Sequence, residues 1–279
     1  MLTKINKIAV IGTGVIGTGW IIRMLAHNKK VMAFDLNIKQ KSILIKEIKR
    51  SLPFVKRLFK KKNINLKNLS FKTSLIETLK DADFIQECAT ENYKLKTKLI
   101  SDIGKYSKSN SIISSSSSGL LPSIIFSKCK NPSRGIIGHP FNPVYMLPAV
   151  EIVPGKKTSK SILKKANNFY RSISMNTIIV KKEIPGYLSD RLQEALWREG
   201  LHIINEGYAT TKDLDRAIED GPGLRWSLMG TFLTFHLAGG KSGMKHMLEQ
   251  FGPALKFPWT KLKAPILSSK LKKRLINGT

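Results

Sequence analysis

The fold is decided by residues 7–17, which read Lys-Ile-Ala-Val-Ile-Gly-Thr-Gly-Val-Ile-Gly. A short apolar run leads into three glycines with the spacing G-x-G-x-x-G, and an apolar segment with helical periodicity follows. In a strand–turn–helix unit, Gly12 allows the tight turn, Gly14 lets the backbone approach a pyrophosphate, and Gly17 lets the helix pack closely against the strand. The stretch therefore predicts a dinucleotide-binding loop at the N-terminus of a helix.

A carboxylate at the end of the next predicted strand supports this interpretation. Asp35 lies 23 residues after Gly12, and it can accept hydrogen bonds from both ribose hydroxyls but would repel a 2′-phosphate. The sequence therefore favours NAD over NADP. The residues predicted to bind the cofactor through this loop are Gly12, Thr13, Gly14, Val15, Ile16, Gly17 and Asp35.

Strand-like and helix-like segments alternate until Pro185-Gly186, after which the patterns are helical. We therefore predict an α/β protein: a Rossmann-type doubly wound, mostly parallel sheet over residues 1–185, followed by a smaller all-α domain over residues 186–279. The predicted strands are Ile8–Ile11, Val31–Asp35, Phe84–Glu87, Ser111–Ser114, Gly135–Gly138, Val150–Val153 and Thr177–Val180. The predicted helices are Val15–His27, Lys39–Lys60, Lys94–Tyr106, Ser159–Ser174, Tyr187–Gly207 and Lys212–Glu219.

The charge balance raises a competing class of function. The chain has 48 Lys and Arg against 19 Asp and Glu, a net charge of +29, and residues 1–185 hold 34 of the basic residues against 10 acidic ones. Such a balance is compatible with a protein that binds polyanions on a Rossmann scaffold. Aromatic residues are sparse in the Lys-rich stretch 39–67, whose apolar residues have helical spacing. We therefore interpret the lysines as a solvated helix face and expect no nucleic-acid partner.

Other broad features limit the compartment and the ligands. Cys88 and Cys129 are the only cysteines, too few for a disulfide framework or a zinc site, so no metal is expected. There is no apolar run of 18 residues and no signal-peptide layout at the N-terminus, so the sequence predicts a cytoplasmic protein without a membrane partner.

One histidine lies in a segment with catalytic potential. His139-Pro140-Phe141-Asn142-Pro143 follows a predicted strand, and Glu151 comes 12 residues after the histidine. A buried carboxylate can hold an imidazole in one tautomer and stabilise its protonated form, which suits a general base near pH 7. Taken alone, a histidine is more often a structural hydrogen-bonding residue. Beside an NAD loop the catalytic interpretation is favoured, because oxidising an alcohol requires a group that accepts the hydroxyl proton.

At these residues the chain resembles the 3-hydroxyacyl-CoA dehydrogenase superfamily. The resemblance is carried by the H-x-F-N-P segment, by Ser118 21 residues before His139, and by Pro185-Gly186-Tyr187-Leu188-Ser189-Asp190-Arg191. It implies a catalytic set of Ser118, His139, Asn142 and Glu151, and it implies that Glu91 and Lys96 of an E-N-x-x-x-K segment contact the cofactor. Asp190 replaces the Asn usual in the acyl-CoA enzymes, which argues against a CoA substrate.

Strings in the second half, 194–199, 223–234 and 250–256, resemble the carnitine 3-dehydrogenase branch of that superfamily. This similarity continues through Pro258-Trp259-Thr260 and Ala264-Pro265, and the family usually extends beyond the equivalent of Thr279. It implies NAD-dependent oxidation of the 3-hydroxyl of L-carnitine and a homodimer; 3-hydroxyacyl-CoA and L-gulonate are the alternative substrates.

L-Carnitine requires a site for a quaternary ammonium group and a site for a carboxylate. Aromatic faces bind such a cation, and a guanidinium binds the carboxylate. Each aromatic residue can equally be an ordinary core residue. The candidates for substrate contact are Trp197, Trp226, Arg198, Arg225 and Asp190, with Tyr187, Phe232 and Phe235 as further aromatic candidates.

Overall fold

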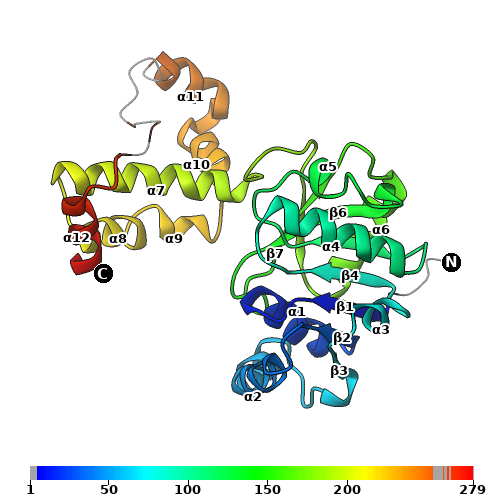
Figure 1. Ribbon diagram of the computed structural model, residues 1–279. Coiled ribbons are helices and arrows are strands. Elements are labelled where there is room, and N and C mark those ends of the chain that lie inside the picture. Colours follow the sequence, from blue (N-terminus) through cyan, green and yellow to red (C-terminus); the bar gives the residue numbers. More distant parts are fainter. Residues whose placement is uncertain (1–4, 254–259, 261–262, 264, 279) are drawn as a thin grey trace. The chain divides into compact units, whose positions relative to one another are not determined.

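The structure is a computed structural model that describes residues 5–253, 260, 263 and 265–278. The chain forms two compact units, Met1–Asp190 and Arg191–Thr279. Strands and helices alternate in the first unit, whereas the elements described in the second unit are helices (Figure 1). The α/β fold with a following helical part agrees with the prediction.

The first unit contains an eight-stranded sheet with the order β3-β2-β1-β4-β5-β6-β7-β8. Every neighbouring pair is parallel except β6 and β7, which are antiparallel. The strands are β1 (Lys7–Ile11), β2 (Lys30–Phe34), β3 (Leu69–Lys72), β4 (Phe84–Glu87), β5 (Ile112–Ser115), β6 (Gly135–Pro140), β7 (Ala149–Pro154) and β8 (Asn176–Ile179). Strand β3 was not predicted. It is a four-residue edge strand in which half-buried residues alternate with exposed ones, so its apolar signal is weak.

Helices cover both faces of this sheet because alternate strand residues point to opposite sides. In β1, Ile8 and Val10 join the core cluster that includes buried residues of α1, α2 and α6, whereas Ala9 and Ile11 join the cluster that includes residues of α3, α4 and α5. The helices of this unit are α1 (Val15–Ala26), α2 (Gln40–Leu58), α3 (Leu75–Leu79), α4 (Tyr93–Tyr106), α5 (Pro122–Ile125) and α6 (Lys160–Ser172).

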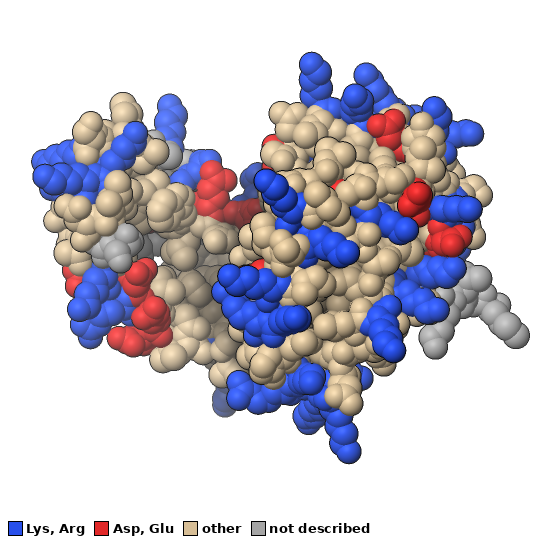
Figure 2. All heavy atoms as spheres, turned by 60° about the horizontal axis from the view of Figure 1, so that its bottom comes forward, with Lys and Arg blue, Asp and Glu red and all other residues tan. Residues whose placement is uncertain are grey.

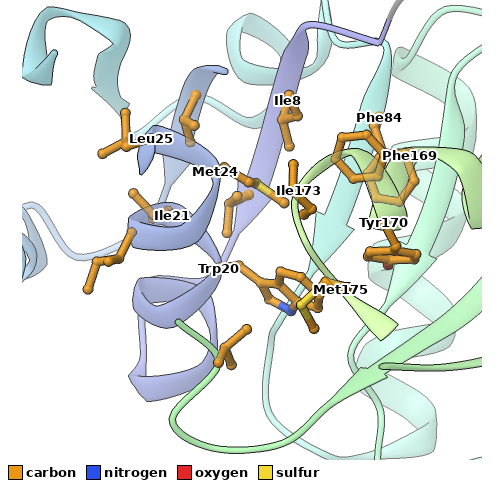
Figure 3. Packing of buried hydrophobic residues seen from close by; sticks show 14 of the residues in the cluster. Ile8, Trp20, Ile21, Met24, Leu25, Phe84, Phe169, Tyr170, Ile173 and Met175 are labelled. Carbon is orange, nitrogen blue, oxygen red and sulfur yellow. The ribbon is translucent and has the colours of Figure 1, made fainter. Parts of the chain in front are cut away.

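The first of these clusters contains the largest aromatic group of the core. Figure 3 shows Trp20 and Met24 of α1 beside Phe169 and Tyr170 of α6. The rings of Phe84 and Phe169 stack with their centroids 4.1 Å apart. Because these residues come from α1, β4 and α6, their packing holds the two helices against the same face of the sheet.

The second unit is built from short helices around α7. Two of the predicted helices, Tyr187–Gly207 and Lys212–Glu219, correspond to α7 and α8. Helix α8 begins with a capping box in which Thr210 and Asp213 satisfy each other's backbone amides. The helices are α7 (Ser189–Glu206), α8 (Thr211–Glu219), α9 (Gly223–Trp226), α10 (Thr231–Ala238), α11 (Gly243–Phe251) and α12 (Ser269–Gly278).

Part of the predicted similarity to carnitine 3-dehydrogenase falls on residues that the structure does not describe. The strings at 254–256, 258–259 and 264 lie outside the described residues. Among the residues that the structure describes, no helix is long and apolar enough to cross a membrane. Basic side chains are scattered over the face of the first unit that Figure 2 shows and outnumber the acidic ones there.

Candidate active site

The glycine loop between β1 and α1 has the geometry that a dinucleotide needs. Gly12 has a positive φ of 94°, and a Cβ there would lie 2.9 Å from the carbonyl oxygen of Cys88. A Cβ at Gly17 would lie 1.9 Å from the carbonyl oxygen of Gly12, so α1 could not begin this close to the strand with any other residue. A Cβ at Gly14 would meet nothing within 4 Å, which leaves open space in front of the helix N-terminus.

This open space suits an anionic ligand. Helix α1 begins at Val15, whose side chain is 70% exposed, and its first turn carries no acidic residue. The unpaired N–H groups and the dipole of such a helix end favour phosphate oxygens. The residues of the loop therefore fit a bound pyrophosphate, as NAD would supply.

Asp35 lies directly after β2 and belongs to the same loop system. Its Oδ2 accepts hydrogen bonds from the backbone N–H of Thr13 (3.1 Å) and from the Thr13 hydroxyl (3.0 Å). Its Oδ1 accepts from the backbone N–H of Asn37 at 3.1 Å. These contacts orient a half-buried carboxylate, and three hydrogen bonds leave part of its acceptor capacity for a ribose hydroxyl.

His139 and Glu151 are brought together by the only antiparallel strand pair described. They are direct partners in the register of β6 and β7, and both are buried. Nδ1 of His139 lies 2.9 Å from Oε2 of Glu151. The spacing of 12 residues thus corresponds to a hairpin-like return of the chain that sets the two side chains face to face.

Glu151 is held in its ionised form by the start of α7. Its Oε1 accepts hydrogen bonds from the backbone N–H groups of Leu188 and Ser189, each at 3.0 Å. Burial raises the pKa of this carboxyl, but the hydrogen bonds from His139, Ser189 and Leu188 outweigh it, so that the pKa lies below its ordinary value. An ionised Glu151 can only accept, so Nδ1 of His139 is the donor in this hydrogen bond.

The free ring nitrogen of His139 faces a second carboxylate. Oδ2 of Asp190 lies 3.8 Å from Nε2. The rings of Phe141 and Tyr187 lie 5.3 and 5.6 Å from the imidazole, measured between centroids. Tyr187 is fully buried, its hydroxyl donates to the carbonyl of Leu120, and burial raises its pKa. The sequence suggested Tyr187 only as one aromatic candidate, whereas in the structure it packs on the proposed base.

The loop that carries Ser118 is fixed by Glu91. Oε1 of Glu91 accepts hydrogen bonds from the Ser117 hydroxyl and from the backbone N–H groups of Ser118 and Gly119. The same loop is joined to the neighbourhood of His139 through the bond from Tyr187 to Leu120. Asn142, by contrast, is an exposed residue just beyond β6, before a cis peptide bond to Pro143.

Lys96 lies in the interior rather than on a surface open to ligand. Its side chain is 1% exposed, and its Nζ donates to both oxygens of Glu87 (2.8 and 3.0 Å) and to the carbonyl of Ala89 (2.9 Å). Its distance to Oε2 of Glu91 is 3.6 Å. Sequence reasoning missed Glu87, although a carboxylate at the end of a fully buried strand is itself a signal that a cationic partner is required.

The substrate candidates of the second unit lie on its helices. Trp197 in α7 and Trp226 in α9 are 59% and 41% exposed. Arg198 pairs with Glu194 one turn earlier in α7, and Arg225 is exposed in α9. Of the predicted site residues in the first unit, the structure brings Glu151 and Asp190 next to the two ring nitrogens of His139.

The fold and the glycine loop define a class, the NAD-dependent dehydrogenases with a Rossmann domain. Residues 7–184 match the family described as 3-hydroxyacyl-CoA dehydrogenase, NAD binding domain, and residues 186–275 match 3-hydroxyacyl-CoA dehydrogenase, C-terminal domain. The chain belongs to the 3-hydroxyacyl-CoA dehydrogenase family. This confirms the resemblance inferred from the sequence and the prediction of NAD.

Within this family, curated relatives with about half of their residues identical are L-carnitine dehydrogenases. An L-carnitine dehydrogenase of Oceanobacillus iheyensis is 50% identical over 98% of this chain and 89% of its own length. An L-carnitine dehydrogenase of Bacillus cereus is 47% identical over 99% of this chain and 84% of its own length. The expected similarity to the carnitine dehydrogenase branch is therefore confirmed.

Solved structures show the same fold at lower identity. The crystal structure of a 5-formyl-3-hydroxy-2-methylpyridine 4-carboxylic acid 5-dehydrogenase has a TM-score of 0.87 at 21% identity, over 98% of this chain and 87% of that one. A (S)-3-hydroxybutyryl-CoA dehydrogenase from Ralstonia eutropha has a TM-score of 0.71 at 22% identity, over 98% of this chain and 92% of that one.

Proposed function

We propose that this protein catalyses the NAD-dependent oxidation of the 3-hydroxyl of L-carnitine to 3-dehydrocarnitine. The names of its relatives at 47–50% identity support the substrate. The observation that carries the chemistry is the contact of 2.9 Å between Nδ1 of His139 and Glu151. Together they supply a base and the group that orients it.

The base acts through the nitrogen that Glu151 leaves free. Oxidation of a secondary alcohol removes one proton from oxygen and one hydride from carbon. Nε2 of His139 accepts the hydroxyl proton, and the carboxylate of Glu151 stabilises the resulting imidazolium through Nδ1. The Gly12–Gly17 loop would hold NAD+, which would accept the hydride when bound.

Other residues of this chain complete the proposed site. Ser118 and Asn142 hydrogen-bond the substrate oxygen or the nicotinamide amide, and Glu91 keeps the Ser118 loop in place. Lys96 acts indirectly, since its ammonium group donates within the protein. In the helical part, Trp197 or Trp226 faces the trimethylammonium group and Arg198 or Arg225 binds the substrate carboxylate.

The same proposal assigns roles to the two parts of the chain. Residues 1–185 bind the cofactor and carry the base, and residues 186–279 serve substrate binding and dimerisation. The protein works as a homodimer in the cytoplasm.

A direct assay tests the activity. Purified protein with NAD+ is followed by NADH absorbance with L-carnitine, D-carnitine, 3-hydroxybutyryl-CoA and L-gulonate as separate substrates. Turnover of L-carnitine with the highest kcat/KM of the four is the expected result. A higher kcat/KM for the acyl-CoA or for L-gulonate would overturn the substrate assignment.

A further inference from the structure

The proposed base lies between two carboxylates, only one of which the chemistry above uses. Glu151 contacts Nδ1 of His139, and Asp190 lies 3.8 Å from Nε2, the nitrogen that receives the substrate proton. The Glu151 side chain is completely buried, whereas that of Asp190 is 36% exposed. Asp190 therefore lies on the side of the imidazole where the reacting hydroxyl must arrive.

The chain segments around this point carry a negative charge. Residues 117–121, 139–151 and 185–190 contain no Lys or Arg, and their acidic residues are Glu151 and Asp190; Arg191 follows directly after Asp190. Glu151 is already satisfied by His139 and by two backbone N–H groups of residues 188 and 189. Of these two carboxylates, Asp190 is the one that lies near Nε2 of His139, the nitrogen proposed to receive the substrate proton.

The geometry limits what the substrate can place beside Asp190. A hydroxyl that gives its proton to Nε2 lies roughly 3 Å from that nitrogen. A group attached to the carbon next to the carbinol carbon then lies only several ångströms from Oδ2 of Asp190. An ionised carboxylate at such a distance attracts a cation and repels an anion, and burial of neighbouring groups strengthens the interaction.

We propose that Asp190 is a specificity-determining residue, which selects a substrate with a fixed positive charge one carbon away from the reacting alcohol. It also orients a zwitterionic hydroxy acid. The negative charge of Asp190 attracts the ammonium end of the substrate to the position beside it and repels the carboxylate end from that position. This inference rests on the proposed oxidation of L-carnitine and deepens it. A quaternary ammonium cannot donate a hydrogen bond, so a nearby carboxylate acts on it through charge alone, in addition to any aromatic face.

The test compares two substrates of equal shape and different charge. The first is L-carnitine, and the second is 3-hydroxy-5,5-dimethylhexanoate, in which a carbon replaces the ammonium nitrogen. Both are assayed with the wild-type protein and with Asp190→Asn, which keeps the size of the side chain and removes its charge. Asp81→Asn is the matched control, because Asp81 is exposed and pairs with Lys7, and its replacement changes the net charge equally.

The expected result is a change in the ratio of the two activities. Asp190→Asn lowers kcat/KM for L-carnitine by about 10- to 100-fold and alters that for the uncharged substrate by less than about threefold. Asp81→Asn leaves both values unchanged. The ratio is measured on one preparation, so partial loss of folded protein cancels; if Asp190→Asn cannot be purified, Asp190→Ser replaces it.

Two outcomes would overturn the inference, and they are distinguishable. Equal losses for both substrates would show that Asp190 only positions His139. Turnover of neither substrate by the wild-type protein would overturn the proposed function itself, and the role of Asp190 with it.

Discussion

Two regions of the first unit differ in the sign and in the burial of their charged groups. On α2, exposed Lys41, Lys46 and Lys49 surround an open hollow of about 610 Å³ that also contains Ile38 and Ile45. Around His139, by contrast, a buried glutamate and a half-buried aspartate flank one imidazole. The exposed lysines are screened by water and salt, whereas each group near His139 has a defined partner. The net charge of +29 therefore describes the surface, whereas the proposed chemistry relies on a few groups of the opposite sign.

The largest expected effect comes from removing the proposed base. His139→Gln should lower kcat for L-carnitine by about 10²–10⁴-fold, because a positioned general base typically contributes that much. The Kd for NADH, measured by fluorescence titration, should stay close to the wild-type value, since the Gly12–Gly17 loop is intact. Near-normal turnover by this variant would refute the role of His139.

The next effect concerns a buried ion pair behind the site. Glu87→Gln should destabilise the protein by about 3–5 kcal/mol, because it removes the buried counter-charge of Lys96 and leaves only the carboxylate of Glu91, 3.6 Å away. The shift of the urea unfolding midpoint measures it. Glu47→Gln removes a half-buried carboxylate from its pair with the exposed Arg50, and it should cost less than about 1 kcal/mol. Similar shifts of the unfolding midpoint for the two variants would show that the buried pair contributes no more to stability than the surface pair does.

A smaller effect should appear as a dependence of stability on pH. The pKa of Glu151 is lowered in the folded protein by its bonds to His139, Ser189 and Leu188, which outweigh burial. Its stabilising contribution is therefore present above its ordinary pKa of 4.5 and is lost as the pH falls through the lower, folded value.

Unfolding midpoints of the wild type and Glu151→Gln between about pH 5.5 and pH 3.5 measure this contribution. The variant should lose less stability on acidification than the wild type. It should still show some loss, because the pKa of Asp83 is also lowered: burial raises it, but bonds from Lys108 and from the backbone of Lys7 and Asn6 outweigh that. Parallel curves for the two proteins would exclude Glu151 as a source of the acid sensitivity.

The smallest effect is expected on α2. Replacing Lys41, Lys46 and Lys49 by Gln should change stability by no more than about 0.5 kcal/mol per substitution and leave kcat/KM unchanged. Binding of a polyanion such as heparin should weaken and should already collapse in the wild type between low and physiological salt. A raised KM for NAD+ in the triple variant would show that this surface takes part in cofactor binding.

The sequence predicted those features that depend on short spacings. Three glycines within six residues and a carboxylate after the next strand specify the loop, because each requirement concerns neighbouring backbone atoms. The alternation of apolar runs and helical patterns likewise predicted a mostly parallel sheet and a helical second part. The edge strand β3 was missed because a short strand with one half-buried face carries little periodicity.

Other features depend on the order of the strands in space. Glu87 is nine residues from Lys96, but only the packing of α4 beside β4 makes them a buried pair. Tyr187 looked like one of several aromatic residues, and only the fold packs it against His139. No local pattern carries such distances, since they are set by which strands pair and by how helices cover them.

By itself the sequence determined that this chain forms a Rossmann unit with an NAD loop, because backbone sterics at Gly12 and Gly17 allow few alternatives. It also pointed to His139 and Glu151, first through their spacing after a predicted strand and then through the family resemblance. Only the tertiary structure decided that Asp190 faces Nε2 of His139, because that contact joins the end of β6 to the start of α7 across 51 residues of sequence. The protonation behaviour of a carboxylate depends on its burial and on the groups beside it, and both are set by contacts between residues far apart in the sequence.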